Sequence, residues 1–403
     1  MRIVPLLFCA LSVVLLNASA ACAADAAFQA FLQSLWPQAQ ELGISRATFD
    51  AATRDLEPDL SLPDLAIPGR SEKPAAQPEF VQTPADYIKE STISGLAATG
   101  RKLYDQYRPA LGTIERQFGV DPTVVLAIYG RETDYGRAKD GLSAIRVLAT
   151  QAYVGKRKDK YRDEFLLALK IAQDLRMRPS EMKSSWAGAM GQTQFMPSNF
   201  VDYAVDFSGD GRADIWTNVP DALASTANYL HRWKWNPALP WGFEVTIPKD
   251  FDYLRSHATY AEWHKLGVRR ADGKPFPDSG LGILFFPSGA GGPAFVVTEN
   301  FAVLKEYNNS DAYAIAVGHL ADRIHGGGLI MAAWPKDDRQ LSRDARIALQ
   351  KKLSALGYKV NDFEGHIDFD IRDNIRSEQK KFGMVPDGNP TALLLEKLGI
   401  GGR

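Results

Sequence analysis

DPTVVLAIYGRETDYG, residues 121–136, is the stretch that decides how this chain folds. Its ends carry helix signals. Asp121 is a favoured N-cap residue, and Pro122 suits the first helical position. Gly136 can end the helix because glycine enters the left-handed conformation without steric cost. The stretch therefore predicts one helix that runs from Pro122 towards Gly136.

One acidic side chain interrupts the apolar face of this helix. Val125, Ile128 and Glu132 lie at i, i+3 and i+7, so they share a face. Burial favours the neutral form of a carboxyl group, and an acid that keeps its proton near neutral pH can protonate a glycosidic oxygen. The alternative is a structural glutamate paired with Arg131 or Arg137.

A second carboxylate, which most glycosidases need, is not evident beside Glu132. Asp134 is near in sequence, but a spacing of two residues along a helix points it away, so we expect it at the surface or the helix end. If Glu132 works alone, the substrate must supply the second functional group.

The segment SWAGAMGQTQFMPS, residues 185–198, is rich in small residues that let a ligand approach the backbone closely. Gln194 offers an amide donor and acceptor suited to sugar hydroxyl or acetamido groups. An ordinary loop that leads into a helix is the structural alternative.

Taken together, these motifs resemble lytic transglycosylases of the membrane-bound B type. The resemblance rests on motifs in the family's order between about Tyr87 and Ile324: residues 130–136, 187–198, 206–211, 227–229 and 307–308, with Tyr313. It implies a mainly α (α+β) fold, with a lysozyme-like core, flanking helices and a small β region.

The resemblance also implies an activity, which is cleavage of the β-1,4 bond between N-acetylmuramic acid and N-acetylglucosamine in peptidoglycan. A single glutamate, here Glu132, would act as acid and then as base, leaving a 1,6-anhydromuramic acid end. Two alternatives stay open: a hydrolytic muramidase, and a cell-wall-binding protein without catalysis. A pure binder has no use for a desolvated acid.

By the same matching, further side chains would contact the glycan or orient the acid. Candidates are Ser185, Gln194, Tyr229, Tyr307, Asn308, Tyr313 and, with a weaker match, Tyr87. Each tyrosine could instead belong to the core. Three tryptophans of the same region, Trp186, Trp216 and Trp233, are expected to be mostly core, with stacking of one of them on sugar as the alternative.

Residues 206–211 resemble a calcium loop. Its candidate ligands are Asp206, Ser208, Asp210, Arg212 and Asp221. The twelfth position is not the usual bidentate glutamate, so this is not an ordinary EF-hand, and a metal-free turn is the alternative. Calcium would be structural, and no cofactor is expected for the reaction.

The last part of the chain, residues 340–403, contains a weak repeat and resembles a small helical peptidoglycan-binding domain. Residues 350–353 are echoed by 379–382, and an acidic-glycine pair follows each, at 364–365 and 387–388. Coincidence of common helix residues is the alternative. We interpret 326–339 as a short tether, which would raise the local substrate concentration.

Outside these motifs, the sequence predicts a coarse order of elements. Residues 28–55 have helical spacing, and dense prolines between 56 and 84 favour an extended segment. Helices are expected from 86 to about 235. A strand at 243–247, a hairpin of 280–286 with 294–298, and a helix at 312–324 follow.

The composition limits localisation and partners. The formal charge is −1, from 47 basic and 48 acidic side chains, which does not favour nucleic acid as a partner. Residues 1–23 resemble a secretory signal peptide, with lipidation at Cys22 as an alternative. We therefore expect an exported, periplasmic monomer, with association with the outer membrane as an alternative. Its catalytic domain would comprise residues 24–330, with the lysozyme-like core at about 86–240. Its ligand would be the glycan strands of peptidoglycan. It could act alone or within complexes for cell-wall synthesis or remodelling.

Overall fold

The computed structural model describes residues 26–67, 69, 82–138 and 141–401. It divides into two compact units, residues 1–75 with 136–222 and residues 76–135 with 223–403. The predicted signal peptide, including Cys22, lies outside the described residues. Within them, no helix is long and apolar enough to cross a membrane.

The first unit is almost entirely helical. Residues 26–34 are helical, and residues 56–67 contain no helix, as the sequence predicts. Its remaining elements are α2 (Trp36–Glu41), α3 (Arg46–Thr53), β1 (Leu142–Ser143), α9 (Ala144–Val154), α10 (Lys158–Asp174), β2 (Lys183–Ser184) and α11 (Pro197–Tyr203). The antiparallel pair of β1 and β2 was not predicted.

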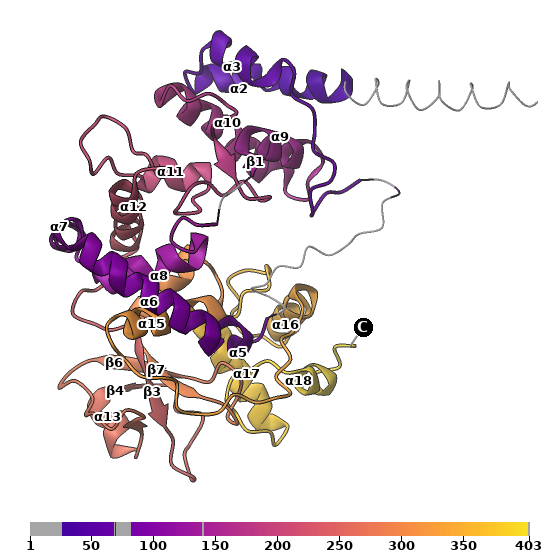
Figure 1. Ribbon diagram of the computed structural model, residues 1–403. Helices are drawn as coiled ribbons and strands as arrows, with labels where there is room; N and C mark the ends of the chain where they lie inside the picture. Colours follow the sequence, from indigo (N-terminus) through magenta and orange to yellow (C-terminus); the bar gives the residue numbers. More distant parts are fainter. Residues whose placement is uncertain (1–25, 68, 70–81, 139–140, 402–403) are drawn as a thin grey trace, which may run out of the picture. The chain divides into compact units, whose positions relative to one another are not determined.

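Helix α8 (Pro122–Thr133) belongs to the second unit and lies next to α6 (Glu90–Gln106) in Figure 1. Its residues from 122 to 130 are all buried, because apolar side chains occupy every face of the helix. It packs against α6 and α15 (Asp311–Ile324). The other helices around them are α5 (Pro84–Tyr87), α7 (Arg108–Phe118), α12 (Val219–Arg232, which begins in the first unit) and α14 (Glu299–Tyr307).

A five-stranded antiparallel sheet has the order β4-β6-β7-β3-β5. Figure 1 labels its strands β3, β4, β6 and β7. The strands are β3 (Gly242–Thr246), β4 (His257–Thr259), β5 (Arg269–Arg270), β6 (Leu281–Phe285) and β7 (Ala294–Val297). The predicted strand and hairpin are confirmed, with β6 paired to β7. Helix α13 (Tyr260–Lys265) completes this region and buries Trp263 fully.

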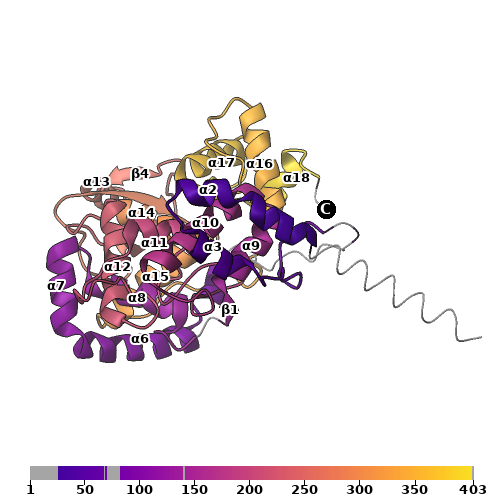
Figure 2. The same cartoon turned by 90° about the horizontal axis from the view of Figure 1, so that it is seen from above.

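The C-terminal helices are α16 (Arg343–Ala355), α17 (Phe369–Lys381) and α18 (Ala392–Lys397), which gather together in Figure 2. The repeat in their sequence corresponds to two equivalent hydrogen bonds in the structure. The side-chain oxygen of Gln350 accepts the Gly365 backbone N–H at 2.8 Å, and that of Gln379 accepts the Gly388 N–H, also at 2.8 Å. Each glutamine thus fixes the turn that follows its own helix.

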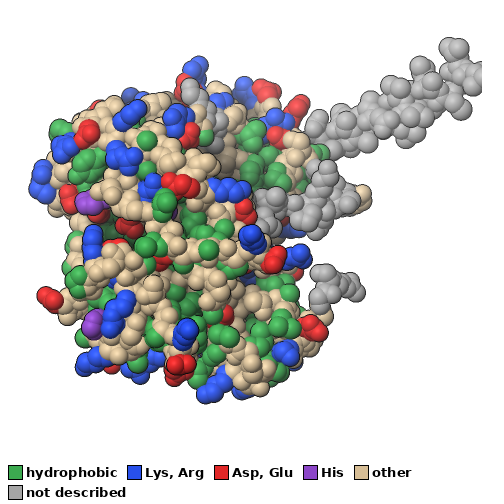
Figure 3. All heavy atoms as spheres, turned by 60° about the horizontal axis from the view of Figure 1, so that its bottom comes forward, with side chains coloured by type: hydrophobic (Ala, Val, Ile, Leu, Met, Phe, Trp, Pro, Cys, Tyr) green, Lys and Arg blue, Asp and Glu red, His purple; other side chains and the backbone are tan. Residues whose placement is uncertain are grey.

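The surface reflects the balanced charge of the sequence. On the face that Figure 3 shows, basic and acidic side chains are interspersed. This mixture agrees with the formal charge of −1. A continuous basic stripe, which phosphate recognition needs, is not seen on this face.

Candidate active site

Helix α8 ends earlier than its sequence predicts, and the reason lies in one aromatic side chain. The helix stops at Thr133, and Asp134, Tyr135 and Gly136 all have positive φ, at 51°, 59° and 76°. The Tyr135 ring folds back over Gly130, where a Cβ would lie 2.6 Å from the ring. Its hydroxyl donates to the Leu96 carbonyl at 2.8 Å. The prediction that Gly136 ends the helix was therefore wrong, and Asp134 takes the C-cap place.

This ending places Glu132 in the last turn of α8, partly buried. Desolvation raises the pKa of its carboxyl group to about 7, while the hydrogen bond from Tyr313 and the charge of Arg131 act to lower it. The Tyr313 Oη donates to Glu132 Oε1 at 2.5 Å. The carboxyl can thus hold a proton near neutral pH and still has a donor that stabilises its charged form.

Two tyrosines form the immediate surroundings of this carboxyl. Tyr313 is 3% exposed and lies on α15, while Tyr307 is half-buried at the end of α14. Burial and the charge of Glu132 raise the pKa of both phenols well above the usual value. Both therefore stay protonated near neutral pH and can donate hydrogen bonds.

The cluster continues through Tyr229 and Thr226 of α12. The rings of Tyr229 and Tyr307 meet edge to face, with centroids 4.8 Å apart. The Tyr229 hydroxyl donates to the Glu306 carbonyl at 2.6 Å, and Thr226 forms a side-chain hydrogen bond with Tyr307. Sequence reasoning missed Thr226, although it precedes the Ala227-Asn228-Tyr229 motif directly and lies three residues before Tyr229 on one helical face.

Tyr87 makes a cation–π contact with Arg131, the residue before Glu132 on α8. The Arg131 guanidinium carbon lies 4.7 Å from the centre of the half-buried Tyr87 ring. Sequence reasoning considered Arg131 only as an ion-pair partner of Glu132, because a stacking partner far along the chain leaves no local signal. Asn308 is half-buried next to Tyr307. The structure thus brings Glu132 together with the predicted tyrosines of its own unit.

Ser185 and Gln194 belong to the other unit, and their role beside Glu132 stays a prediction. Within that unit they shape one tight loop. Ser185 Oγ accepts the Ala189 N–H at 3.2 Å, and Gln194 donates from Nε2 to the Gly191 carbonyl at 3.0 Å. Gln194 adopts a φ of 53°, which is uncommon for a residue with a side chain.

The tryptophans are less buried than expected. Trp233 is 41% exposed, so its prediction as core was wrong, and Trp186 and Trp216 are only half-buried. The Trp233 ring lies 6.3 Å from that of Tyr229. The chain around the end of α12 leaves some side chains exposed to solvent. Helical spacing alone did not predict that Trp233 is one of them.

The predicted calcium loop is held by hydrogen bonds. Asp221 is fully buried, and its carboxylate accepts the backbone N–H groups of Phe207, Ser208 and Asp214 at 2.9–3.1 Å. Asp206 accepts the N–H groups of residues 209–211. No group of three or more metal-ligating side chains occurs among the described residues. Because the Asp221 carboxylate accepts three backbone N–H groups, this arrangement does not direct it towards a metal ion, and calcium binding stays a prediction.

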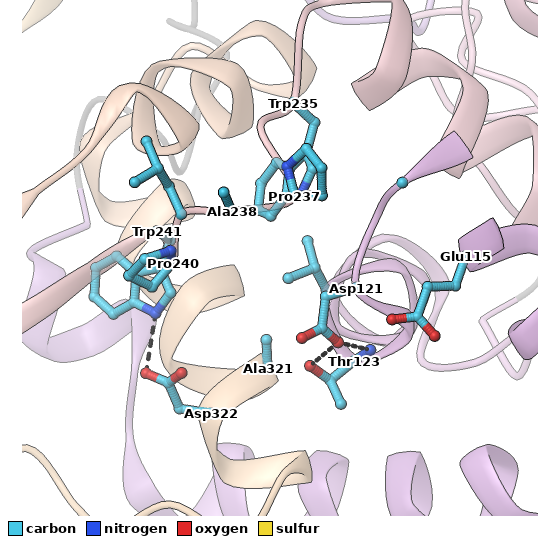
Figure 4. Close-up of a pocket in the computed structure, with 13 residues that line it drawn as sticks. Glu115, Asp121, Thr123, Trp235, Pro237, Ala238, Pro240, Trp241, Ala321 and Asp322 are labelled. Atoms are coloured by element: carbon cyan, nitrogen blue, oxygen red, sulfur yellow. Dashed lines mark hydrogen bonds between the residues drawn. The ribbon is translucent and has the colours of Figure 1, made fainter. Parts of the chain in front are cut away.

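A separate cavity lies at the opposite end of α8. Its volume is about 410 Å³, and its wall includes Glu115, Asp121, Trp235 and Asp322. Figure 4 shows the Trp241 indole donating to Asp322, with a distance of 2.9 Å. Burial raises the Asp322 pKa to about 7. Since Glu132 lies in the last turn of α8, this second perturbed acid is not part of the Glu132 cluster.

Comparison with known families supports the interpretation of both parts of the chain. The family described as Transglycosylase SLT domain matches residues 27–322. A peptidoglycan binding domain matches residues 342–398. Membrane-bound lytic murein transglycosylase B of Escherichia coli K12 is 31% identical over 276 residues, which cover 67% of this chain and 74% of that protein.

Solved structures agree with this assignment. SltB3 from Pseudomonas aeruginosa, in complex with NAG-anhNAM-pentapeptide, is 41% identical, with a TM-score of 0.80 over 92% of this chain and 99% of that chain. Escherichia coli lytic transglycosylase Slt35, in complex with calcium, is 28% identical, with a TM-score of 0.50 over 60% of this chain and 77% of that one. The chain therefore belongs to the transglycosylase SLT family of lytic murein transglycosylases.

Proposed function

We propose that this protein cleaves the β-1,4 bond between N-acetylmuramic acid and N-acetylglucosamine in peptidoglycan, with Glu132 as the only acid and base. The observation that carries the proposal is the environment of Glu132. Its pKa of about 7 leaves both protonation states accessible near neutral pH, and burial, Tyr313 and Arg131 set this value. No carboxylate of the described residues is among these influences.

In the first step, protonated Glu132 gives its proton to the glycosidic oxygen as the bond from the muramyl C1 breaks. The N-acetylglucosamine leaves with a hydroxyl group, and the neighbouring acetamido group of the substrate stabilises the electron-poor C1. The resulting Glu132 carboxylate receives a charge-assisted hydrogen bond from Tyr313. This donor limits the cost of leaving a charge in a partly buried place.

In the second step, the same carboxylate takes the proton of the muramyl 6-hydroxyl, and O6 bonds to C1. The product is a 1,6-anhydro ring, and Glu132 returns to its protonated state. A pKa close to the working pH suits one group for both roles. SltB3, which is similar over most of this chain, was solved with an anhydromuramyl ligand, and this supports the same chemistry here.

The other predicted contacts belong to the same proposal. Tyr87, Tyr229, Tyr307 and Asn308 would line the glycan groove, and Ser185 and Gln194 are proposed as further sugar contacts or as groups that orient the acid. The C-terminal helices would bind the wall, as the domain match suggests. We also propose export of the protein through residues 1–23; the Escherichia coli relative is named as membrane-bound.

The test is mass spectrometry of the muropeptides that the mature protein and a Glu132→Gln variant release from purified sacculi. We expect anhydro products, about 18 mass units lighter than hydrated muropeptides because no water is added. The variant, which cannot give a proton, should release none. Reducing-end products would indicate a muramidase, and no release by either protein, with sacculus binding retained, would indicate a binding protein.

A further inference from the structure

The C-terminal helices are attached to the catalytic part through packed side chains. The Phe369 ring of α17 meets the rings of Phe285 and Phe301, with centroids 5.8 Å and 6.1 Å away. Arg376 is 2% exposed and donates to the Leu284 carbonyl at 2.9 Å. The segment 326–339 therefore joins two parts that are also in direct contact through these side chains.

A buried ion cluster lies at the same contact. Arg372 of α17 donates from Nη2 to Asp311 Oδ2 at 2.5 Å, and the Lys305 ammonium lies 2.8 Å from Asp311 Oδ1. The side chains of Arg372, Lys305 and Asp311 are 6%, 13% and 16% exposed. The two cations hold the pKa of Asp311 well below its usual range despite burial.

Arg372 is fixed on its other sides as well. Its Nη1 donates to the Gly388 carbonyl at 3.0 Å, and its guanidinium carbon lies 4.8 Å from the centre of the Phe285 ring. Arg346 of α16 lines the same small cavity as Asp311 and Arg372. An arginine held by so many partners presents its charge to Asp311 in one defined geometry.

Asp311 connects this cluster to the residues around Glu132. It is the first residue of α15, and Tyr313 follows two positions later. Lys305 belongs to α14, which ends at Tyr307. The ion pair of Lys305 and Asp311 thus joins the two ends of the segment that carries Tyr307 and Asn308. Arg372, from the C-terminal helices, forms a second ion pair with Asp311 and stabilises this connection.

We propose that Arg372 is a positioning residue for the reaction, acting through Asp311 to hold the start of α15 so that Tyr313 reaches Glu132. This inference rests on the function proposed above. It gives the C-terminal helices a second role besides wall binding, which is to complete the active site. Without Arg372, Asp311 would lose one of its two ion-pair partners and keep Lys305, and removing one partner of a buried ion pair is strongly destabilising.

The experiment compares Arg372→Met, Arg372→Lys and the control Arg343→Met, which removes an exposed arginine of α16. The substrate is soluble peptide-free glycan strands, so that binding to intact wall does not limit the rate. For Arg372→Met we expect kcat to fall about fivefold or more with KM little changed, since a small displacement at an active site has large effects. The alkaline limb of the pH profile should move to higher pH as Glu132 loses its donor.

Arg372→Lys keeps the charge and should restore most of kcat, and Arg343→Met should resemble the parent protein. Circular dichroism checks folding. If Arg372→Met does not fold, the nearly isosteric Asp311→Asn variant replaces it, with the same loss of kcat expected. Weaker sacculus binding with unchanged kcat and an unchanged pH profile would overturn the proposal, and so would an equal loss of kcat in Arg343→Met.

A carbon-13 titration of the Glu132 carboxyl, assigned with Glu132→Gln, separates this inference from the function on which it rests. If the parent protein forms no anhydro product, the proposed function fails. The titration still tests the coupling in that case. An identical Glu132 pKa in the parent and in Arg372→Met would refute positioning, whereas a higher value in the variant would support it.

Discussion

Tyr313→Phe removes one hydroxyl group and leaves the shape of the site nearly unchanged. The lost hydrogen bond joins Tyr313 Oη to Glu132 Oε1 at 2.5 Å, and the tyrosine is 3% exposed. A hydrogen bond to a charged group contributes about 1.5–3 kcal/mol, and one between neutral groups about 0.5–1.5 kcal/mol. The charged form of Glu132 therefore loses about 1 kcal/mol more than the neutral form.

One pKa unit corresponds to about 1.4 kcal/mol, so this loss raises the pKa by nearly one unit. The parent value is about 7, which places the variant near 8. At pH 8 about a tenth of the parent protein would carry the proton, against about half of the variant. Because the first step needs protonated Glu132, the alkaline limb of kcat/KM should move up by nearly one pH unit.

The assay is the initial rate of anhydro-product release from soluble glycan strands, measured between about pH 5 and pH 9, a range that brackets the Glu132 pKa. The matched control is Tyr260→Phe, which removes a buried hydroxyl that has no hydrogen-bond partner in the described part of the chain. Its pH profile should equal that of the parent. An alkaline limb that stays in place, or moves to lower pH, in Tyr313→Phe would refute the reasoning about Glu132.

Three further predictions concern stability. Burial raises the pKa of Asp322 from 3.8 to about 7, so its contribution is fully present below pH 4 and is lost as the pH rises through 7. Relative to the parent, Asp322→Asn should therefore gain in melting temperature between pH 4 and pH 8, and a pH-independent difference would contradict this. Asp221→Ala leaves three backbone N–H groups of the loop without their acceptor and should destabilise the fold by about 3 kcal/mol, measured by urea unfolding with the exposed Asp210→Ala as control. The parent should melt at the same temperature in calcium and in EGTA; a clear rise with calcium would show that the loop rearranges to bind it.

Local signals in the sequence were sufficient for several elements. Asp121 caps α8 as predicted, accepting the Thr123 N–H at 2.7 Å, because capping depends only on neighbouring residues. The hairpin of β6 and β7 and the helix α15 follow from short hydrophobic patterns. The repeated glutamine and glycine pairs predicted two similar helix-turn units, since each glutamine bonds to the turn of its own unit.

The end of α8 shows where such local signals stop. Gly136 is a favourable C-cap, yet the helix stops three residues earlier because the Tyr135 ring packs on Gly130. The solvent exposure of single side chains could not be predicted from the sequence either, as the exposed Trp233 shows. Both features depend on which neighbours surround a residue, and helical spacing does not contain that information.

The sequence by itself determined the helix that carries Glu132, the family of the chain and the outline of its C-terminal module. Only the tertiary structure decided the chemistry of that glutamate. Its donor, Tyr313, is 181 residues away, and Arg372 lies 61 residues from the aspartate that it braces. A pKa depends on desolvation and on charges nearby in space, and these contacts between distant residues form only when the chain has folded.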